Sequence, residues 1–262
     1  MAIVHVGNIT DFIAAISVAD NEVIVDNDID AQDWAAAETT VRATKITGNG
    51  HAIKNIQHVA AGNLFLFGAD CIIDELDFTN FICFNTSDAA TFHGRYYQAT
   101  FNNCKFQGRF HNFAYRRIHF NRCTMTFENG LCFAHWTDYS GVSNWSECYI
   151  DYKVQTGNAF PPYSGWDTST MRNCYIKGEI VASSPNGAFA FNMYNCVVNV
   201  ELVGSATTQI NSQPTSATTI YNSDKISSTV TITPQTNMIA LTDAQLKDPA
   251  AVAATGFPLV TS

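Results

Sequence analysis

The sequence has little charge, no basic clusters and no long apolar run. Only 14% of its 262 residues are charged, and 14 Lys and Arg against 23 Asp and Glu give a formal net charge of −9. Binding to phosphates needs grouped Lys and Arg, and the longest basic run here is Arg116-Arg117. The composition therefore argues against a nucleic-acid partner.

The longest apolar stretches are also too short to cross a membrane. No segment approaches the 18 consecutive apolar residues of a spanning helix. The N-terminus lacks a basic region and carries Asp11 inside its apolar stretch, which is unlike a secretory signal peptide. We therefore expect no membrane insertion and no export by a signal peptide.

The eight cysteines do not have the spacing of a zinc site. Structural zinc uses cysteine pairs separated by two to four residues, whereas the closest pair, Cys123 and Cys132, is separated by eight. Without export a disulfide framework is not expected either. The cysteines are interpreted as free, buried thiols, and neither a metal nor a cofactor is predicted.

Six of the cysteines share one local pattern. An apolar residue follows each of them two positions later, a polar residue directly precedes it, and in five of the six a large apolar residue stands three positions before it. This alternation is strand periodicity, with the cysteine and the following apolar residue pointing inward. The predicted core ladder consists of Cys71, Cys104, Cys123, Cys148, Cys174 and Cys196.

The spacing of these cysteines indicates a solenoid. Their intervals run from 19 to 33 residues and average 25, and a period in the twenties with one strand signature per unit is typical of stacked repeats. Leucine-rich repeats are the competing architecture, but their L-x-x-L-x-L consensus is absent. The segments between the cysteines are rich in aromatic residues, Gly and Thr without a helical period. We predict a parallel β-helix of about eight or nine rungs, with an insertion between Cys71 and Cys104.

At residues 1–235 the sequence resembles the right-handed, pectate-lyase-like β-helix superfamily. Residues 3–30 resemble the cap of such folds, with a short amphipathic helix around Phe12 and Ile16 before a first strand at 23–25. Asn103, Asn173 and Asn195 resemble the asparagine ladder of β-helix corners, which Arg122 and Glu147 interrupt. The resemblance implies an all-β, single-stranded right-handed parallel β-helix. It implies no activity, because this scaffold carries lyases, hydrolases, adhesins and virion proteins.

The chain is expected to form one domain, residues 1–262. Residues 1–45 would form the N-terminal cap and first rung, 46–203 the regular rungs, and 204–262 the last strands and a helical or loop-like C-terminal cap. In that last part, Thr242 or Asp243 is the predicted N-cap of a terminal helix that stops at Gly256 and covers the last rung.

Two pairs of carboxylates have the separation of neighbouring rungs. Glu128 and Asp151 are 23 residues apart, and Asp138 and Asp167 are 29 apart, but 23 acidic residues supply several such pairs by chance. Glycoside hydrolysis would need two close carboxyls.

Other chemistry-bearing patterns are weaker. The acidic turn that contains Asp26, Asp28 and Asp30 could bind Ca²⁺, although a solvated acidic corner is the favoured interpretation. The histidines lack ligand spacing, and the nucleophile-elbow, P-loop and Rossmann motifs are absent. No catalytic residue is predicted.

Aromatic residues concentrate between residues 136 and 166. Trp136, Tyr139, Tyr163 and Trp166 fall in segments rich in Asp, Ser, Thr and Gly, and are the predicted binding or interface residues. Aromatic side chains are enriched at subunit interfaces and also suit a sugar platform. A self-interface is favoured, and a sugar platform and simple loop packing remain alternatives.

The group that the chain most resembles is the β-helical virion proteins of bacteriophages. The resemblance implies a non-enzymatic structural or adhesive protein, a capsid decoration or head fibre, that is assembled in the host cytoplasm and located in the virion. It also implies a homotrimer, with the major capsid protein and a host surface glycan as further partners. The alternatives are a polysaccharide-binding or depolymerising spike and an intracellular or surface repeat protein of bacteria.

Overall fold

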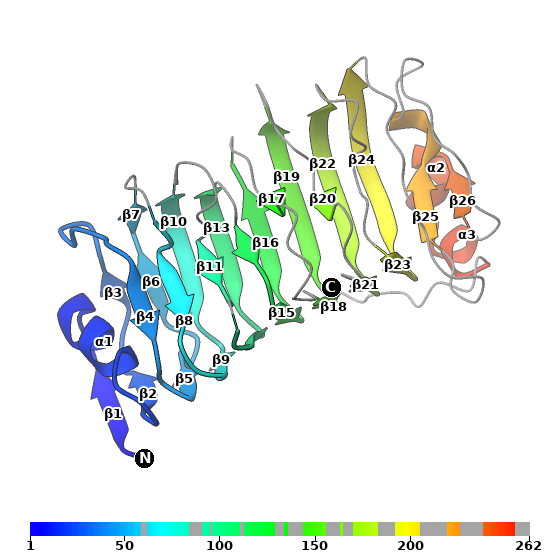
Figure 1. Ribbon diagram of the computed structural model, residues 1–262. Helices are drawn as coiled ribbons and strands as arrows, with labels where there is room; N and C mark the ends of the chain where they lie inside the picture. The colour runs from blue at the N-terminus through cyan, green and yellow to red at the C-terminus, as the bar shows by residue number, and fades with distance from the viewer. Residues whose placement is uncertain are drawn as a thin grey trace.

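The computed structural model describes residues 1–58, 62–83, 91–94, 96–110, 113–128, 134–135, 144–155, 163–164, 170–182, 192–204, 219–225 and 238–254. It is an elongated coil in which the chain advances by one strand on each face per turn, with the N-terminus at one end and the last helices at the other (Figure 1). The strands of the coil pair in parallel, and each strand pairs with the strand one turn earlier or later.

The first face of the coil is a nine-stranded sheet. Its strands are short, with three or four residues each, because the chain turns a corner after each of them. In spatial order they are β1 (Ile3–Val6), β2 (Glu22–Val25), β5 (Lys45–Thr47), β9 (Cys71–Asp74), β12 (Ala99–Asn102), β15 (Ile118–Asn121), β18 (Asn144–Ser146), β21 (Thr170–Arg172) and β23 (Asn192–Tyr194).

The second face is an eleven-stranded sheet whose longest strands are β22 and β24, with eight residues each. It contains β3 (Ile29–Asp30), β6 (Ala52–Lys54), β7 (Gln57–His58), β10 (Asp77–Cys83), β13 (Lys105–Phe110), β16 (Thr124–Phe127), β19 (Tyr149–Gln155), β22 (Tyr175–Ala182), β24 (Val197–Gly204), β25 (Thr219–Asn222) and β26 (Met238–Leu241).

The third face is less regular. Four strands form one sheet and two more pair separately. They are β4 (Thr39–Val41), β8 (Phe65–Phe67), β11 (Phe92–His93) and β14 (Ala114–Tyr115), followed by β17 (Ala134–His135) and β20 (Tyr163–Ser164).

The interior is filled by rows of side chains that stack in register from rung to rung. Inward positions of the first sheet form one row, in which Phe101 pairs with Phe120 and Phe120 with Trp145. Inward positions of the second sheet form another, in which Phe78 pairs with Phe106 and Phe106 with Met125. Phenylalanine rings stack along these rows at 5.3–5.4 Å between centroids. Strand alternation therefore builds one continuous apolar core.

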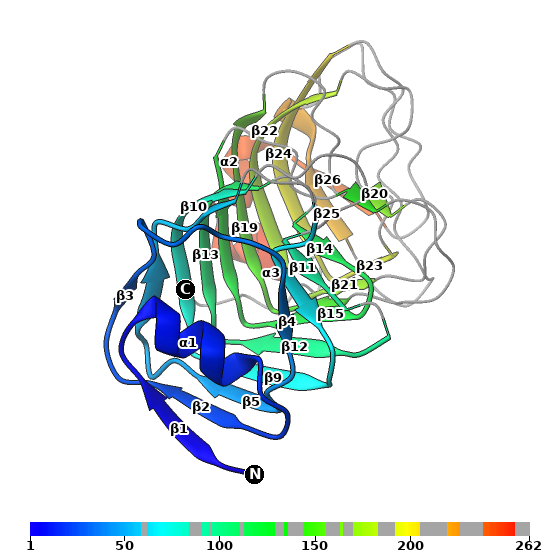
Figure 2. The same ribbon diagram turned by 60° about the vertical axis from the view of Figure 1, so that its left-hand side comes forward.

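The predicted capping helix is present as α1 (Ile9–Ile16). The Asn8 side chain accepts the backbone N–H of Asp11 and caps its N-terminus, and Phe12 and Ile16 are buried against the core. Figure 2 shows α1 lying across the N-terminal end of the coil. The first strand is not 23–25, as expected, but β1, which precedes the helix and pairs with β2. The sequence does not reveal β1 because its apolar residues do not alternate with polar ones, and of the three only Val6 is buried while Ile3 is exposed.

The C-terminal cap differs from the single helix that was expected. Thr242 is the N-cap of α2 (Asp243–Leu246) and forms a capping box with Gln245. A second helix, α3 (Pro249–Ala253), starts after Asp248, because proline begins a helix more readily than it continues one. Val252 and Leu246 pack with Val197 and Ile220 in a cluster separate from the main core. These helices therefore rest on the outer side of the second sheet, and Gly256 lies outside the described residues.

The fold class is confirmed: the chain is an all-β parallel β-solenoid with few helices. The rung count depends on the face on which it is taken, since nine strands stack in the first sheet and six strands are described on the third face. In the described part of the chain, no helix is both long and apolar enough to cross a membrane.

Candidate functional surface

The corner between the first and second sheets repeats the same geometry in successive rungs. One residue adopts a left-handed conformation, with φ between 50° and 56°, and the next residue is a buried cysteine. A single left-handed residue reverses the pleat and turns the chain sharply. The left-handed residues are Asn103, Arg122, Glu147, Asn173 and Asn195.

All six cysteines are buried as predicted, but Cys71 does not stack in the row that the other five form. Cys71 lies at the start of β9 and pairs with Ala99, not with a cysteine. The corner of its rung is formed by Glu75, with φ 53°, and the buried residue that follows is Leu76. The residues around Cys71 match most of the frame, but the corner of this rung lies later in the sequence. Leu76, five residues after Cys71, therefore takes the position that cysteine has in the other rungs. Part of the long interval to Cys104 thus comes from this difference of five residues, and the expected insertion stays a prediction because residues 84–90 lie outside the described part of the chain.

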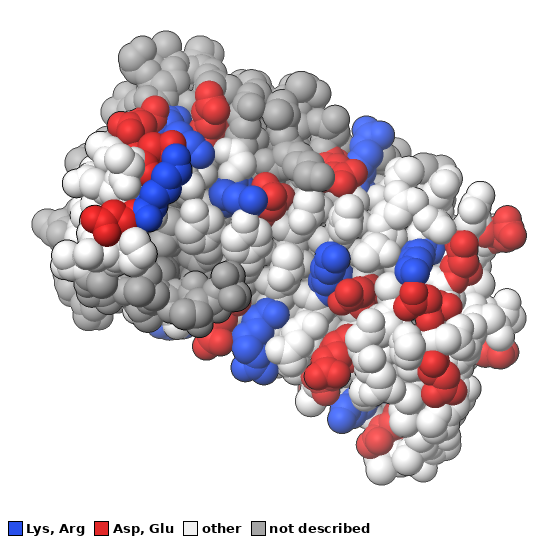
Figure 3. Space-filling view, turned by 180° about the vertical axis from the view of Figure 1, so that it is seen from behind, with Lys and Arg blue, Asp and Glu red and all other residues white. Residues whose placement is uncertain are grey.

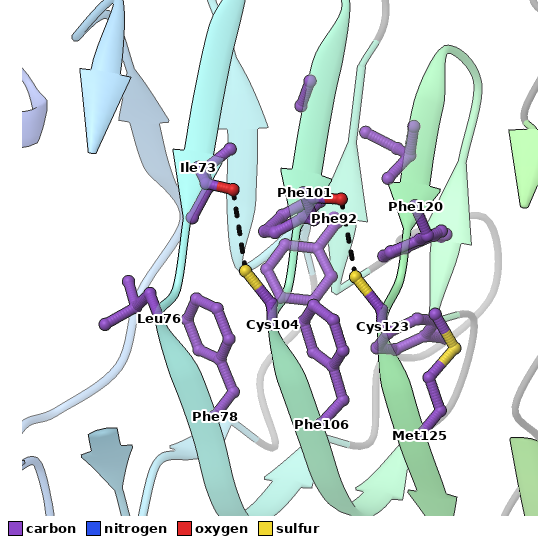
Figure 4. Close-up of a cluster of buried hydrophobic side chains, with 14 of the residues drawn as sticks. Ile73, Leu76, Phe78, Phe92, Phe101, Cys104, Phe106, Phe120, Cys123 and Met125 are labelled. Carbon is purple, nitrogen blue, oxygen red and sulfur yellow. Dashed lines mark hydrogen bonds between the residues drawn. The ribbon is translucent and has the colours of Figure 1, made fainter. Parts of the chain in front are cut away.

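The five stacked cysteines, here called the thiol ladder, bridge successive rungs. Each thiol donates to a backbone carbonyl of the preceding rung, at 3.6 Å from Cys104 to Ile73 and 3.4 Å from Cys123 to Phe101 (Figure 4). The same bond recurs from Cys148 to Phe120, Cys174 to Trp145 and Cys196 to Met171.

The thiol ladder is a structural element. All five cysteines are buried and free, and burial raises the pKa of the Cys104, Cys148, Cys174 and Cys196 thiols above the ordinary range. Burial likewise raises the pKa of Cys71 to about 12. At Cys123 burial is outweighed by hydrogen bonds with the Cys104 and Cys148 thiols, which lower the pKa of Cys123. Nucleophilic cysteines combine a lowered pKa with partial exposure, whereas Cys123 is only 1% exposed. The ladder carries packing and hydrogen bonds.

The asparagine ladder takes a different form from the one expected. Arg122 continues the corner row rather than interrupting it, because its Nε donates to Asn103 Oδ1 at 2.8 Å. A second amide row lies one residue earlier, where Asn121 donates to Asn102 and Asn102 donates to Asp74, each at 2.8 Å. Polar side chains at the corners thus bond along the coil axis.

Glu128 and Asp151 come from neighbouring rungs, as their separation suggested, but each has a polar partner of its own. The Asp151 carboxylate lies 3.1 Å from Lys177 Nζ, and Glu128 Oε1 accepts from Gln107 at 3.5 Å. Hydrolysis by a carboxyl pair would need the two groups to share one site, and these contacts direct them to different neighbours. Asp138 and Asp167 lie outside the described residues.

Each of the three carboxylates in the acidic turn at 26–30 has a polar partner within the chain. Asp28 contacts Lys54, whose hydrogen bond, with that of the Ala52 N–H, lowers the pKa of the carboxyl. Asn55 lowers the pKa of Asp30 in the same way, and Asp26 bonds His5 at 2.8 Å. Among the residues that the structure describes, no three His, Cys, Asp or Glu side chains converge to hold a metal ion.

The outer side of the second sheet carries an aromatic pair, of which Tyr149 is exposed and Tyr175 partly buried. The rings of Tyr149 and Tyr175 stack in register at 5.6 Å, and Tyr149 is 38% exposed. Lys177 Nζ lies 5.3 Å from the centre of the Tyr149 ring. Asn199 donates to the Tyr175 hydroxyl at 3.0 Å. This platform of rings flanked by polar groups suits a flat, hydroxyl-rich ligand.

A second exposed aromatic pair lies at the corner that leads from the third face into the first sheet. Tyr96 is 69% exposed and Tyr97 42%. In the next rung the same corner is made by Arg116 and Arg117, and Arg117 Nη1 donates to the Tyr96 carbonyl at 3.3 Å. We call these four residues the Tyr–Arg corner. Sequence reasoning missed it, although both the basic run and the paired tyrosines are visible in the sequence.

The predicted interface residues are not placed by the structure. Trp136, Tyr139 and Trp166 lie outside the described residues, and of Tyr163 only the backbone, in β20, is described. The expectation of an aromatic interface at 136–166 therefore stays a prediction.

Much of the surface bears no charge. Figure 3 shows Lys, Arg, Asp and Glu scattered in small groups over a mainly uncharged face.

Comparisons with protein-family models, with curated proteins and with solved structures gave no match to this chain. The likeness to β-helix proteins thus extends to the fold alone.

Proposed function

We propose that this chain is a non-enzymatic structural or adhesive protein that works through its surface, in the manner of a capsid decoration or head fibre of a bacteriophage. The observation that supports this most is the in-register core, in which the side chains that could do chemistry are committed to the fold. The thiols bond carbonyls, and the acidic side chains of the turn at 26–30 bond lysine, amide and histidine groups.

The coil also has properties that favour lateral association. The described surface is poor in charge, so packing one coil against another costs little desolvation, and closed symmetry would bury the same patch on every copy. In this proposal the protein is a homotrimer in the virion and contacts the major capsid protein.

A polysaccharide-binding spike is the second candidate. The stacked Tyr149 and Tyr175 rings, beside Lys177 and Asn199, favour it, because they present an apolar platform with polar groups at its rim. In this version the partner is a host surface glycan.

The test is light scattering after size exclusion, for the full chain alone and with purified phage capsids. We expect a trimer at micromolar concentration that Trp136→Ala or Trp166→Ala weakens. Trp34→Ala should leave association unchanged but lower stability, because Trp34 stacks on Phe65 and packs against the core. A monomer that binds neither capsids nor a bacterial surface would eliminate the proposal, and cleavage of a capsular glycan would replace it with the enzymatic alternative.

A further inference from the structure

The Tyr–Arg corner combines high exposure with a rigid backbone. The Gly94 N–H donates to the Arg116 carbonyl at 3.1 Å, and the Ala99 N–H donates to the Arg117 carbonyl at 3.0 Å. Tyr97 in turn donates its N–H to the Gly94 carbonyl at 2.7 Å. These bonds tie the backbones of the two loops of successive rungs together, so the positions from which Tyr96, Tyr97 and Arg117 project are set before any partner arrives. Arg116 is only partly exposed.

The two loops also approach unusually closely. A Cβ atom on Gly94 would lie 2.1 Å from the Arg116 carbonyl oxygen, so only glycine allows this contact. The neighbouring acidic residue of the preceding rung, Asp70, accepts the Gln98 backbone N–H at 2.7 Å. Its carboxylate thus has a partner within the turn.

The backbone of this corner is strained. Arg116 and Arg117 have φ of 56° and 53°, and in the described part of the chain they are the one place where two consecutive non-glycine residues are left-handed. Glycine or asparagine would occupy these positions at lower cost. Strain of this kind is often retained where a side chain has a role outside the fold.

The chemistry of the corner differs from that of the molecule as a whole. The chain carries a net charge of −9, yet this corner presents arginine beside exposed tyrosine. Arginine and tyrosine are among the residues most enriched in the energetic centres of protein interfaces. The guanidinium fork pairs with carboxylates through two parallel hydrogen bonds.

From these observations we infer that the Tyr–Arg corner is a docking site for an acidic segment of a partner protein. A carboxylate of the partner bonds the exposed Arg117, while apolar atoms of the partner lie against Tyr96 and Tyr97. The inference rests on the proposed function in one respect, namely that a non-catalytic coil acts through its surface.

The experiment measures binding of the full-length protein to immobilised poly-L-glutamate at low salt, with dextran sulfate of equal charge as a competitor. The test variants are Arg117→Asn and Tyr96→Ala. The matched control is Arg122→Asn, which removes the same charge from a residue that is also exposed and left-handed, with φ 52°, but lies at the corner of the thiol ladder. Thermal unfolding is recorded for each variant.

We expect Arg117→Asn to weaken binding about tenfold, the scale of one charge-assisted hydrogen bond, and Tyr96→Ala to weaken it as well. Arg122→Asn should change it less than about twofold, because it lies outside the corner. Because asparagine tolerates the left-handed conformation, Arg117→Asn should keep or raise the unfolding temperature, which a purely structural role for Arg117 would not allow.

Three results would overturn the inference. Equal losses of binding in Arg117→Asn and Arg122→Asn would indicate that binding depends on the overall charge of the protein and not on this corner. Stronger binding to dextran sulfate than to polyglutamate would make the ligand an anionic glycan, and loss of self-association in Arg117→Asn would make it a second copy of this chain. Failure of the capsid experiment together with Arg117-dependent binding would instead remove the virion function and leave the docking site in place.

Discussion

The two corners that flank the first sheet are built on opposite plans. The corner that leaves the sheet turns on one left-handed residue followed by a buried cysteine, and it recurs from Asn103 to Asn195. The corner that enters the sheet varies in length from rung to rung and exposes Tyr96, Tyr97 and Arg117. The repeated geometry of the leaving corner serves the fold. The variable, exposed entering corner is where a function can reside.

The largest effect should come from charging the regular corner. Cys148→Asp places a carboxylate among buried apolar side chains and takes away the thiol that bonds the Phe120 carbonyl. We expect a loss of about 3–5 kcal/mol in the free energy of unfolding, as for an uncompensated buried charge. Cys148→Val is the control and should cost about 1 kcal/mol, with urea unfolding as the measurement. A mild Cys148→Asp phenotype would mean that this corner is open to water.

The entering corner should be next most sensitive, at its point of closest approach. Gly94→Ala forces a Cβ into the Arg116 carbonyl, and we expect a loss of about 1–3 kcal/mol from overpacking, measured by urea unfolding. Gly50→Ala is the matched control, since no atom lies within 4 Å of its Cβ and only its φ of 78° is unfavourable. If Gly50→Ala costs more than Gly94→Ala, conformation rather than contact limits these turns.

The left-handed position itself should have a smaller effect. Asn173→Ala keeps the buried corner residue Cys174 but adds the cost of a left-handed alanine, about 1 kcal/mol. Asn173→Gly should be close to neutral, because glycine adopts this conformation without a Cβ clash. Equal stabilities of the two variants, by thermal unfolding, would show that the φ of 54° at Asn173 is not enforced by the fold.

The smallest effect should be a pH dependence at the N-terminal turn, which is the first-rung counterpart of the regular corner. The pKa of Asp28 is lowered in the folded chain by the hydrogen bond from Lys54, and then by the Ala52 N–H. Its ionised form therefore stabilises the fold above about pH 4, and this contribution is lost as the pH falls through the lowered pKa. Asp28→Asn should flatten the profile of stability against pH below about pH 4, measured by thermal unfolding. An unchanged profile would assign the acid sensitivity elsewhere.

The sequence was sufficient for the parts of the fold that repeat. The alternation around each cysteine of the thiol ladder predicted that the cysteine and the residue two after it point inward, as Cys123 and Met125 do. It did not show the corner at Arg122, which places Phe120 and Met125 on different sheets. The capping helix followed from its amphipathic pattern, and Thr242 was one of the two N-caps proposed.

The parts that could not be predicted depend on conformation rather than on residue type. One signal did separate Cys71 from the other five cysteines, since Gly68 and not a large apolar residue stands three positions before it. The sequence alone does not show that Leu76 takes the place of cysteine in the ladder. A left-handed arginine has no sequence signal comparable to Asn or Gly, so the sequence shows the Tyr–Arg corner only as a short basic run. The exposure of Tyr149 depends on where α2 and α3 end on the second sheet.

The thiol ladder places chemically identical groups at successive depths of the molecule. In a coil of this kind each rung touches only its two neighbours, so partial opening spreads inward from the ends. Beyond Cys196 only β24, β25, a 3-10 turn (Ser223–Lys225), β26 and the last helices follow among the described elements, whereas Cys123 and Cys148 lie near the middle of the stack. The set of thiols that has become exposed therefore shows how many rungs have opened. The order in which an opening exposes them is set by their position along the axis.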